Sequence, residues 1–343
     1  MINEYNKMKN KILIIAEISA NHNNDLNLTK KTIEAIKKSG ADAVKIQTYK
    51  PDSLTLKLND GYFKPRTKGL WKGYTPWELY SEASLPYEWH LEIKELCDKN
   101  NLIFFSSPFD KEAVDFLENL DVPYYKIASL EITDIPLIGY TASKGKPMII
   151  STGVAEIKDI HEAIKICKKN NNDDITLLKC TSEYPASISE ANLISLIDIK
   201  ERFNVKVGIS DHTLGSVVPI TAVSMGISVI EKHFTLSRDN GGVDASFSME
   251  PDEFAEMVKN VRLAESSIGK VDYKVSYENK MRRRSLFVVE DIKEGELFTN
   301  KNIRSIRPGY GLCPKYFDDI INKRAKTSLK TGTPLSFEHI HKK

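Results

Sequence analysis

The 343-residue sequence is poor in cysteine and in long apolar runs, and its charges nearly cancel. Its four cysteines are widely spaced and form no Cys-x-x-Cys pair, which argues against a structural zinc site or a disulfide framework. Lysine and arginine number 49 against 47 acidic residues, so the net charge of +2 gives no electrostatic basis for binding nucleic acid or an anionic membrane. Unpaired cysteines are typical of a reducing, cytoplasmic compartment.

No segment approaches the roughly 20 apolar residues that a membrane-spanning helix needs. The N-terminal segment MINEYNKMKN is polar and lacks the apolar core of a signal peptide. The hydrophobic content of 41% and the charged content of 28% are those of an ordinary globular protein. We therefore expect a cytoplasmic protein with no membrane contact.

Short apolar runs recur along most of the chain, and amphipathic segments separate them. The runs are rich in Ile, Val, Leu, Phe and Tyr, as expected of strands that are buried on both faces. They span residues 11–17, 42–47, 102–107, 124–129, 148–153, 175–180, 205–210 and 229–234. Helices are expected at 27–40, 87–100, 111–120, 157–170 and 251–268. For the first of these we expect Asn27 to cap the start and Gly40 the end.

Eight strand–helix units within residues 1–270 favour an α/β protein with a (β/α)₈ barrel. A doubly wound open sheet is the alternative, and it requires a reversal of strand order that the sequence does not reveal. Residues 271–284 are polar and predict a linker. Residues 285–343 are turn-rich and strand-like, and they predict a small, mostly β domain. A domain of this size is marginal alone, so we expect it to dock on a partner surface.

Polar side chains occur at the carboxyl ends of all the apolar runs. In a parallel barrel these ends meet at one mouth, where the active sites of such barrels lie. Lys45 and Lys126 lie within apolar runs, where an ammonium group is costly to bury without an anion, so both suit a phosphate or carboxylate ligand. The alternative for any one strand is that it simply becomes polar as it leaves the core.

Two histidines end neighbouring runs, so we expect the rings of His212 and His233 to lie close together. Two neutral imidazoles make half of a metal site, whereas zinc enzymes usually supply three protein ligands. A histidine pair completed by water and substrate better suits an exchangeable divalent cation that acts as a Lewis acid. Two hydrogen-bonded histidines without a metal are the alternative.

The stretches described above resemble the sialic acid synthase (nonulosonate synthase) family. The resemblance runs in order along nearly the whole chain, through IAEISANHN, GADAVKIQTY, FFSSPF, YKIAS, ISTG, LKCTSEYP, GISDHTLG, VIEKHF, VDASFSMEPDEF, RRSLFVVEDIKEGE and SIRPGYGL. It implies a (β/α)₈ TIM barrel followed by an antifreeze-like (SAF) domain. It also implies a domain-swapped homodimer, in which each small domain reaches over the partner's barrel mouth.

The resemblance implies a condensation of phosphoenolpyruvate with the open-chain aldehyde of an N-acetylated hexosamine, giving a nine-carbon 2-keto acid and phosphate. The stretches KIQTYKPDSLTL, GLW with a following LY, PYEWH and LKCTSEYP are most similar to the pseudaminic acid synthase branch. There the aldehyde is 2,4-diacetamido-2,4,6-trideoxy-L-altrose. N-acetylneuraminate and legionaminate synthases are the alternatives. A non-catalytic sugar- or anion-binding protein is a further alternative, but it would need no metal facing an aldehyde.

The resemblance also implies roles for individual residues. By this likeness His212 and His233 hold Mn²⁺, Mg²⁺ or Co²⁺, Glu17 acts as an acid/base or positions water, and Arg307 reaches the sugar from the partner subunit. The implied phosphoenolpyruvate cradle comprises Lys45, Ser107, Lys126, Ser129, Ser151, Ser182 and Ser210. The implied sugar contacts are Glu17, Gln47, Tyr184, Asp244 and Arg307.

Two positions depart from the family pattern. Asn24 stands where the family has glycine, and because asparagine tolerates a positive φ angle, we expect the same turn. Ser182 stands where neuraminate synthases often have asparagine. This change affects one phosphate contact and favours the pseudaminate branch.

Overall fold

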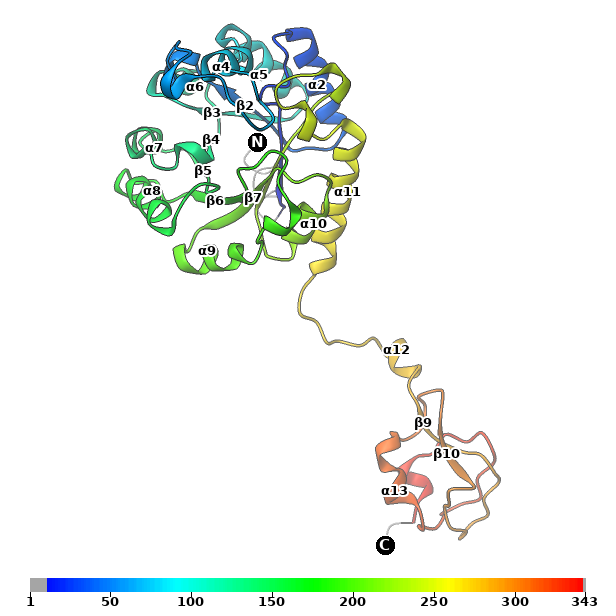
Figure 1. Cartoon of the computed structure of the whole chain (residues 1–343). Helices are drawn as coiled ribbons and strands as arrows, with labels where there is room; N and C mark the ends of the chain where they lie inside the picture. Colours follow the sequence, from blue (N-terminus) through cyan, green and yellow to red (C-terminus); the bar gives the residue numbers. More distant parts are fainter. Residues whose placement is uncertain (1–10, 342–343) are drawn as a thin grey trace. The chain divides into compact units, whose positions relative to one another are not determined.

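The chain divides into two compact units between Gly269 and Lys270, and the computed structural model describes residues 11–341. In the first unit, eight parallel strands of these residues close into a barrel. The barrel is seen in Figure 1, and its closure is the pairing of β8 with β1. The strands are β1 (Leu13–Glu17), β2 (Ala43–Thr48), β3 (Ile103–Pro108), β4 (Tyr125–Ile127), β5 (Met148–Ser151), β6 (Ile175–Cys180), β7 (Lys206–Asp211) and β8 (Val229–His233). The predicted barrel is confirmed, and its closure excludes the open sheet.

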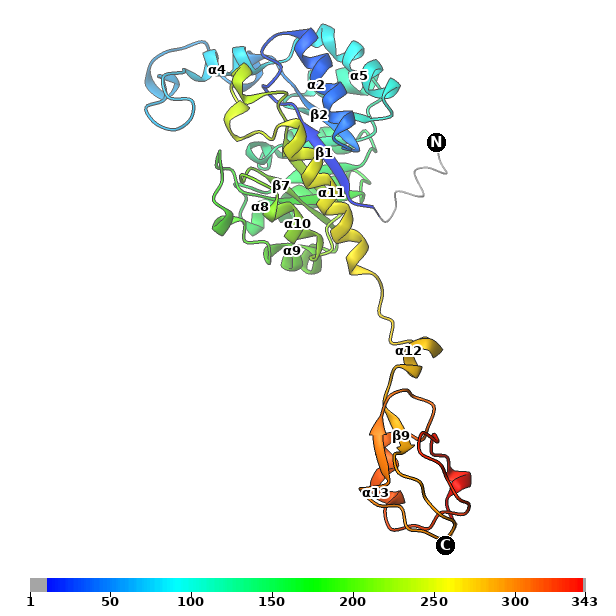
Figure 2. The ribbon, with the colours of Figure 1, turned by 90° about the vertical axis from the view of Figure 1, so that its right-hand side faces the viewer.

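Helices surround the barrel, as both ribbon views show (Figures 1 and 2). In the described part of the first unit they are α2 (Leu26–Lys38), α3 (Pro51–Leu54), α4 (Pro76–Ala83), α5 (His90–Lys99), α6 (Lys111–Asn119), α7 (Ile135–Ala142), α8 (Ile157–Lys169), α9 (Ser195–Phe203), α10 (Val217–Val223) and α11 (Pro251–Ile268). Every helix expected from the sequence has a counterpart among them. Their buried faces pack on the apolar strands and form one continuous core.

The first helix starts at a different cap from the one predicted. Asp25, and not Asn27, is the N-cap of α2, because its carboxylate accepts hydrogen bonds from the amides of Asn27 and Leu28. At the other end Gly40 follows the C-cap with a φ angle of +83°, a conformation that favours glycine. Asn24 has a φ angle of +51°, so the expected turn at this departure from the family pattern is confirmed.

A long connection, residues 49–86, separates β2 from α5, and the apolar patterns predict no element there. It contains α3, a 3₁₀ turn at Gly61–Phe63, and α4. The start of α4 is fixed by a capping box, in which Thr75 and Glu78 each bond the other's backbone amide. Figure 2 shows the loop before α4 reaching away from the barrel.

The second unit is small and has its own apolar core. Strands β9 (Ser285–Val288) and β10 (Ile303–Ile306) pair in antiparallel fashion, and isolated bridges such as Ile292–Leu329 extend the pairing. This unit also contains α13 (Phe317–Ile320), and α12 (Tyr277–Met281) lies within the segment predicted to be a linker. Within residues 11–341, no helix has the length and apolarity needed to cross a membrane. The polar N-terminal segment noted above, residues 1–10, lies outside the described residues.

Candidate active site

Four oppositely charged side chains meet inside the mouth of the barrel. Lys45 Nζ on β2 lies 2.6 Å from Glu17 Oε2 on β1 and 3.8 Å from Glu231 Oε1 on β8. Lys126 Nζ on β4 lies 3.4 Å from the same Glu231 oxygen. Each of these side chains is at most 5% exposed, so the ion pairs form where little water reaches. The two predicted lysines are brought together, and carboxylates already balance their charge.

Burial and pairing together set the protonation of this cluster. Burial raises the pKa of Glu17 to about 7, and the Lys45 ammonium offsets only part of that shift. Burial lowers the pKa of Lys126. Burial would raise the pKa of Glu231, but Lys126 and Lys45 outweigh it and the net shift is downward. Glu231 is therefore the charged partner of both lysines, and Glu17 can carry a proton near neutral pH.

The two predicted metal ligands, His212 and His233, lie side by side. Their ring centroids are 5.3 Å apart, with an interplanar angle of 63°. His212 Nδ1 lies 2.8 Å from the Thr181 carbonyl oxygen, and because a carbonyl only accepts, this nitrogen carries the proton. In the neutral ring, the Nε2 atom of His212 keeps its lone pair for another partner. The Cys180 thiol lies 3.8 Å from the same Nδ1 atom.

The histidine pair fits a divalent cation. Burial and nearby positive charges lower the pKa of His233 well below its ordinary value, so its ring is neutral and can act as a ligand. Its buried Nδ1 atom has no hydrogen-bond partner among the described residues. Residues 11–341 contain no cluster of three or more His, Cys, Asp or Glu ligands. Two protein ligands with open positions beside them suit an exchangeable Lewis acid better than structural zinc.

Serine hydroxyls of the predicted cradle lie around the lysines. Ser107 Oγ accepts a hydrogen bond of 3.2 Å from Lys45, and Ser210 Oγ donates one of 3.3 Å to Glu231. Ser151 Oγ is buried and has no hydrogen-bond partner in the part of the chain that the structure describes. Ser107 and Ser210 therefore join the ion-pair cluster, while Ser151 keeps a hydroxyl for a ligand at the end of β5.

Gly153 leaves a recess beside Ser129 and Ser182. Its amide donates a hydrogen bond of 3.1 Å to Ser129 Oγ. A Cβ atom on Gly153 would lie 2.1 Å from Ser182 Oγ and 2.8 Å from Ser129 Oγ, which is closer than real Cβ contacts. The missing side chain thus keeps two hydroxyls exposed to one small space, which suits the oxygens of a phosphate or carboxylate.

Three of the five predicted sugar contacts line a cavity of about 350 Å³, a volume typical of small-molecule sites. In it Gln47 Nε2 donates a hydrogen bond of 2.9 Å to Ser19 Oγ. Asp244 Oδ2 accepts one of 3.3 Å from the Ala20 amide. The other predicted site residues that line this cavity are Ser129, Ser182, Tyr184 and His233. One space therefore connects the serine recess, His233 and three of the sugar contacts.

Tyr184 packs against both histidines. Its ring centroid lies 4.3 Å from that of His212 and 6.4 Å from that of His233. The Trp71 ring lies 5.7 Å from the Tyr184 ring. Trp71 Nε1 also donates a hydrogen bond of 2.9 Å to the Val243 carbonyl. The segment between β2 and α5 is thereby tied to the loop that carries Asp244.

Two carboxylates of the site were missing from the predicted site residues. Glu231 lies within the last apolar run, residues 229–234, and it pairs with both lysines. Glu131, in a 3₁₀ turn at Ser129–Glu131, lines the cavity, and its buried Oε2 atom lacks a hydrogen-bond partner among the described residues. Burial raises the pKa of Glu131 to about 7, while Lys126 opposes the shift in part. In the sequence, the only feature that points to Glu131 is its position two residues after Ser129, just beyond an apolar run.

A second buried ion pair lies behind the histidines. Lys232 Nζ is 2.5 Å from Asp211 Oδ2 and donates a hydrogen bond of 2.6 Å to the Thr213 carbonyl. Asp211 Oδ1 accepts from the Thr213 amide at 3.0 Å and from its hydroxyl at 2.8 Å. Because side chains alternate along β8, Lys232 points to the opposite face from Glu231 and His233. The pair fixes the turn that holds His212.

Arg307 lies apart from the other predicted site residues in the sequence, in the second compact unit. It directly follows β10 and is exposed. The barrel unit therefore brings together every predicted site residue except this one, and the role of Arg307 toward a partner subunit stays a prediction.

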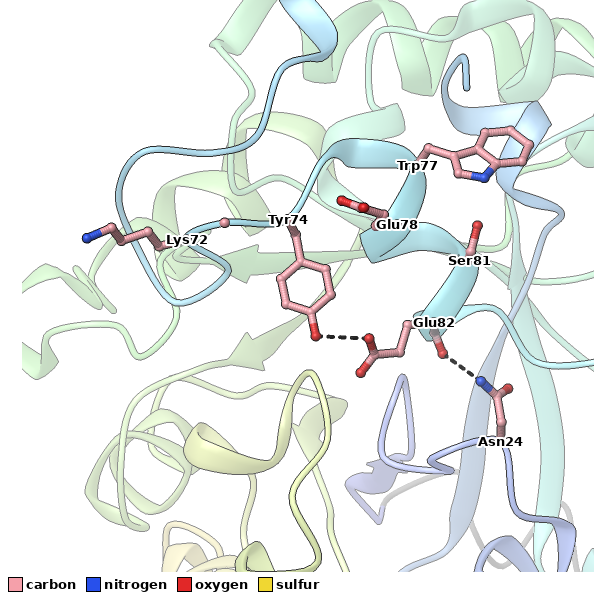
Figure 3. A pocket seen from close by; sticks show the side chains of 8 residues that line it. Asn24, Lys72, Tyr74, Trp77, Glu78, Ser81 and Glu82 are labelled. Carbon is pink, nitrogen blue, oxygen red and sulfur yellow. Dashed lines mark hydrogen bonds between the residues drawn. The ribbon is translucent and has the colours of Figure 1, made fainter. Parts of the chain in front are cut away.

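A separate hollow of about 710 Å³ lies against α4 (Figure 3). Its lining residues are Asn24, Lys72, Gly73, Tyr74, Trp77, Glu78, Ser81 and Glu82, and none of them is a predicted site residue. In it the Tyr74 hydroxyl donates to Glu82 at 2.9 Å, and Asn24 Nδ2 donates to the Glu82 carbonyl at 3.3 Å. These bonds fasten the loop before α4 and the turn after β1 to the same helix.

Comparison with known proteins identifies the architecture. The NeuB family model matches residues 32–273, and the SAF domain model matches residues 283–341. The chain belongs to the NeuB family. The resemblance to sialic acid synthases is therefore confirmed, and the small second unit contains the expected SAF domain.

Several NeuB-family relatives match over almost the whole chain. The chain is 45% identical to a pseudaminic acid synthase of Helicobacter pylori, over 96% of this chain and 98% of the relative. It is 38% identical to an N,N'-diacetyllegionaminic acid synthase of Legionella pneumophila, over 95% and 94%. The crystal structure of an N-acetylneuraminic acid synthetase from Leptospira borgpetersenii has a TM-score of 0.70 and 31% identity, and covers 78% of this chain and 88% of that chain.

Proposed function

We propose that this protein is a pseudaminic acid synthase, a transferase that forms a carbon–carbon bond between phosphoenolpyruvate and 2,4-diacetamido-2,4,6-trideoxy-L-altrose. The observation that carries the proposal is the cavity in which the serine recess and His233 meet three of the predicted sugar contacts. The 45% identity to the Helicobacter pylori pseudaminic acid synthase supports this sugar over the legionaminate and neuraminate precursors. A mere anion-binding protein would have no use for the histidine pair.

Phosphoenolpyruvate is bound by the cations and hydroxyls at the strand ends. Lys45 and Lys126 offset the charge of its carboxylate and phosphate, and they act strongly because little water reaches them. Ser129 and Ser182 offer hydroxyls on either side of the Gly153 recess. Ser107, Ser151 and Ser210 complete the cradle. Fixed before the substrate arrives, these groups need little reorganisation during the reaction.

The sugar lies between the cradle and the rest of the cavity. His212 and His233 would hold a divalent cation, Mn²⁺, Mg²⁺ or Co²⁺, which as a Lewis acid polarises the aldehyde oxygen. Gln47, Tyr184 and Asp244 orient the carbon chain. The enol carbon C3 of phosphoenolpyruvate then attacks the aldehyde carbon, and the new carbon–carbon bond leaves a cationic centre at C2.

Two carboxyl groups with raised pKa values handle the protons. Glu17, with a pKa of about 7, donates a proton to the oxygen of the former aldehyde. Water adds to C2, and Glu131, also with a pKa of about 7, accepts the proton that this water releases. The C2–O bond to phosphate then breaks, the phosphate leaves with a proton, and the 2-keto acid remains. The bond cleaved is therefore C–O and not P–O.

We also propose that the enzyme works as a domain-swapped homodimer in which the partner subunit's Arg307 contacts the sugar. Exposed apolar side chains on the loops after β4 to β7 support a docking surface around the mouth. They are Leu130, Val154, Ile188 and Leu214. The free thiols of all four cysteines support a reducing, cytoplasmic setting.

The deciding experiment measures phosphate release from phosphoenolpyruvate with Mn²⁺ and one of three aldehydes. These are the diacetamido-trideoxy-altrose, the legionaminate precursor and N-acetylmannosamine. Turnover with the altrose compound alone supports the proposal. Turnover with another aldehyde alone would keep the mechanism and reassign the sugar. No phosphate from any aldehyde, with or without EDTA, would leave the binding-protein alternative.

A further inference from the structure

We infer that an apolar wall of the cavity binds the methyl-bearing end of the sugar and discriminates against a hydroxyl group at C6. The wall consists of Tyr49, Leu54, Leu79, Tyr80 and Phe109, all of which line the cavity. This inference rests on the proposed function, because it concerns the far end of the same substrate. The inference names residues that determine which sugar is bound. Neither the fold nor the metal pair determines this specificity.

The wall is a compact group built from two connections. Tyr49, Leu54, Leu79 and Tyr80 belong to the long segment between β2 and α5, and Phe109 directly follows β3. The Tyr49 ring contacts Phe109 at 5.1 Å and Tyr80 at 6.2 Å between centroids, both edge to face. Tyr49 and Leu79 are only 2% and 4% exposed, so the wall is packed into the protein behind its cavity face.

The wall is separate from the histidine pair. Within the described residues, ring contacts join the histidines to Tyr184 and Phe247, and none joins them to Tyr49, Tyr80 or Phe109. Both groups nevertheless line one cavity, since His233 is among its lining residues. Within this cavity, a sugar whose aldehyde carbon C1 faces His233 can extend its opposite end, C4 to C6, toward the wall.

Several contacts hold the wall in place. Trp71 Nε1 bonds the Val243 carbonyl, which anchors the segment to the loop after β8. The start of α4, which carries Leu79 and Tyr80, is fixed by its capping box. On the other side of α4 the Tyr74–Glu82 hydrogen bond closes the preceding loop onto the helix (Figure 3). The wall is thus preorganised. Its residues cannot easily move to bring a hydrogen-bonding partner to a polar group placed against them.

A methyl group gains contact area at such a wall, whereas a hydroxyl must leave water and receives no hydrogen bond from Leu54, Leu79 or Phe109. The difference of one group in an apolar pocket is worth roughly 10- to 200-fold in kcat/KM. We expect the wild-type enzyme to prefer the 6-deoxy altrose over 2,4-diacetamido-2,4-dideoxy-L-altrose, which keeps the 6-hydroxyl, by about 10- to 100-fold.

The test compares kcat/KM for these two sugars in Leu54→Asn and in a matched control. Leu54 is half-buried and lines the cavity, whereas Leu56 in the same segment is 56% exposed and does not. Leu54→Asn should lower the preference for the 6-deoxy sugar by about tenfold, because its amide can bond the extra hydroxyl. Leu56→Asn should leave the preference unchanged. Thermal unfolding checks that both variants fold.

A second variant keeps the test decisive if Leu54→Asn does not fold. Tyr80→Phe retains the ring and should leave the preference unchanged, whereas a larger preference would mean that the phenol hydroxyl accepts the 6-hydroxyl. That result, or equal kcat/KM for the two sugars in the wild type, would overturn the inference while leaving the synthase function intact. Failure to release phosphate with either altrose would instead refute the proposed sugar, and the inference with it.

Discussion

Lys126 and Glu231 come from strands β4 and β8, four strands apart in the closed barrel, yet their charged atoms lie 3.4 Å apart. The pair therefore spans the interior of the barrel mouth. Because Lys45 also lies within 3.8 Å of Glu231, one carboxylate balances two ammonium groups from different strands. This arrangement holds two cations close together before any anionic substrate arrives.

Breaking this pair should destabilise the barrel. Glu231→Gln leaves Lys126 without its carboxylate, and Lys126→Met leaves Glu231 only the longer contact with Lys45. Each variant is expected to lower the free energy of unfolding by about 3 kcal/mol. The double variant should lose less than the sum of the two. Chemical denaturation of all four proteins measures this coupling.

An exposed pair provides the control for that cycle. Lys50 and Glu112 lie 3.3 Å apart, but their side chains are 57% and 82% exposed. Their coupling in the cycle Lys50→Met and Glu112→Gln should be below about 1 kcal/mol. If the buried pair coupled no more strongly than the exposed one, the Lys126–Glu231 pair would not contribute to the free energy of unfolding as predicted.

Removing either histidine should strongly weaken metal binding without unfolding the barrel. We expect His212→Ala and His233→Ala to weaken Mn²⁺ binding by more than about 100-fold, since each removes one of two protein ligands. Electron paramagnetic resonance of free Mn²⁺ measures binding independently of turnover. His161, exposed on α8, supplies the control His161→Ala, which should bind as the wild type does. Undiminished Mn²⁺ binding in both site variants would remove the metal assignment.

Glu131 should make stability depend on pH in a definite direction. Because burial raises its pKa from 4.5 to about 7 in the folded protein, the folded state holds this proton more tightly than the unfolded state. Its contribution to stability is therefore complete below pH 4.5 and is lost as the pH rises toward 7. Glu131→Gln should be relatively more stable than the wild type at pH 8, compared with the difference at pH 5. Thermal unfolding at both pH values measures this.

The same variant separates stability from chemistry. Glutamine cannot accept a proton from water, so Glu131→Gln should lose turnover by about 100-fold or more even where it is the more stable protein. A variant with wild-type turnover would show that another group takes the proton.

Arg307 should act across the dimer. Arg307→Ala should lower kcat/KM for the sugar by about 10- to 100-fold while the barrel stays folded. Co-expression with a Lys45→Met subunit at equal levels should restore about one quarter of the wild-type sites, because only the mixed dimer contains one complete site. Heterodimers isolated by two affinity tags that show no recovery would place Arg307 in the site of its own chain.

The barrel and the strand-end residues could be predicted because both follow from local patterns. Apolar runs of strand length fix the eight strands, and parallel order then puts their polar ends at one mouth. The balance of charge could not be predicted, since Glu231 meets Lys126 only when the barrel closes. Glu131 was missed because it lies in a 3₁₀ turn outside any periodic segment. Four of the five wall residues were missed because the segment between β2 and α5 has no regular apolar period.

The three consecutive polar residues that end β8 also favour one pairing register of this strand in the barrel. Glu231 and His233 face inward and Lys232 faces Asp211. A slip of one residue in the pairing of β8 would exchange the two faces. Lys232 would then join two other ammonium groups inside the mouth, and Glu231 would be pressed toward Asp211. Like-charge repulsion thus raises the free energy of a misregistered barrel above that of the native one. The charged residues of the site therefore also favour the correct register of β8.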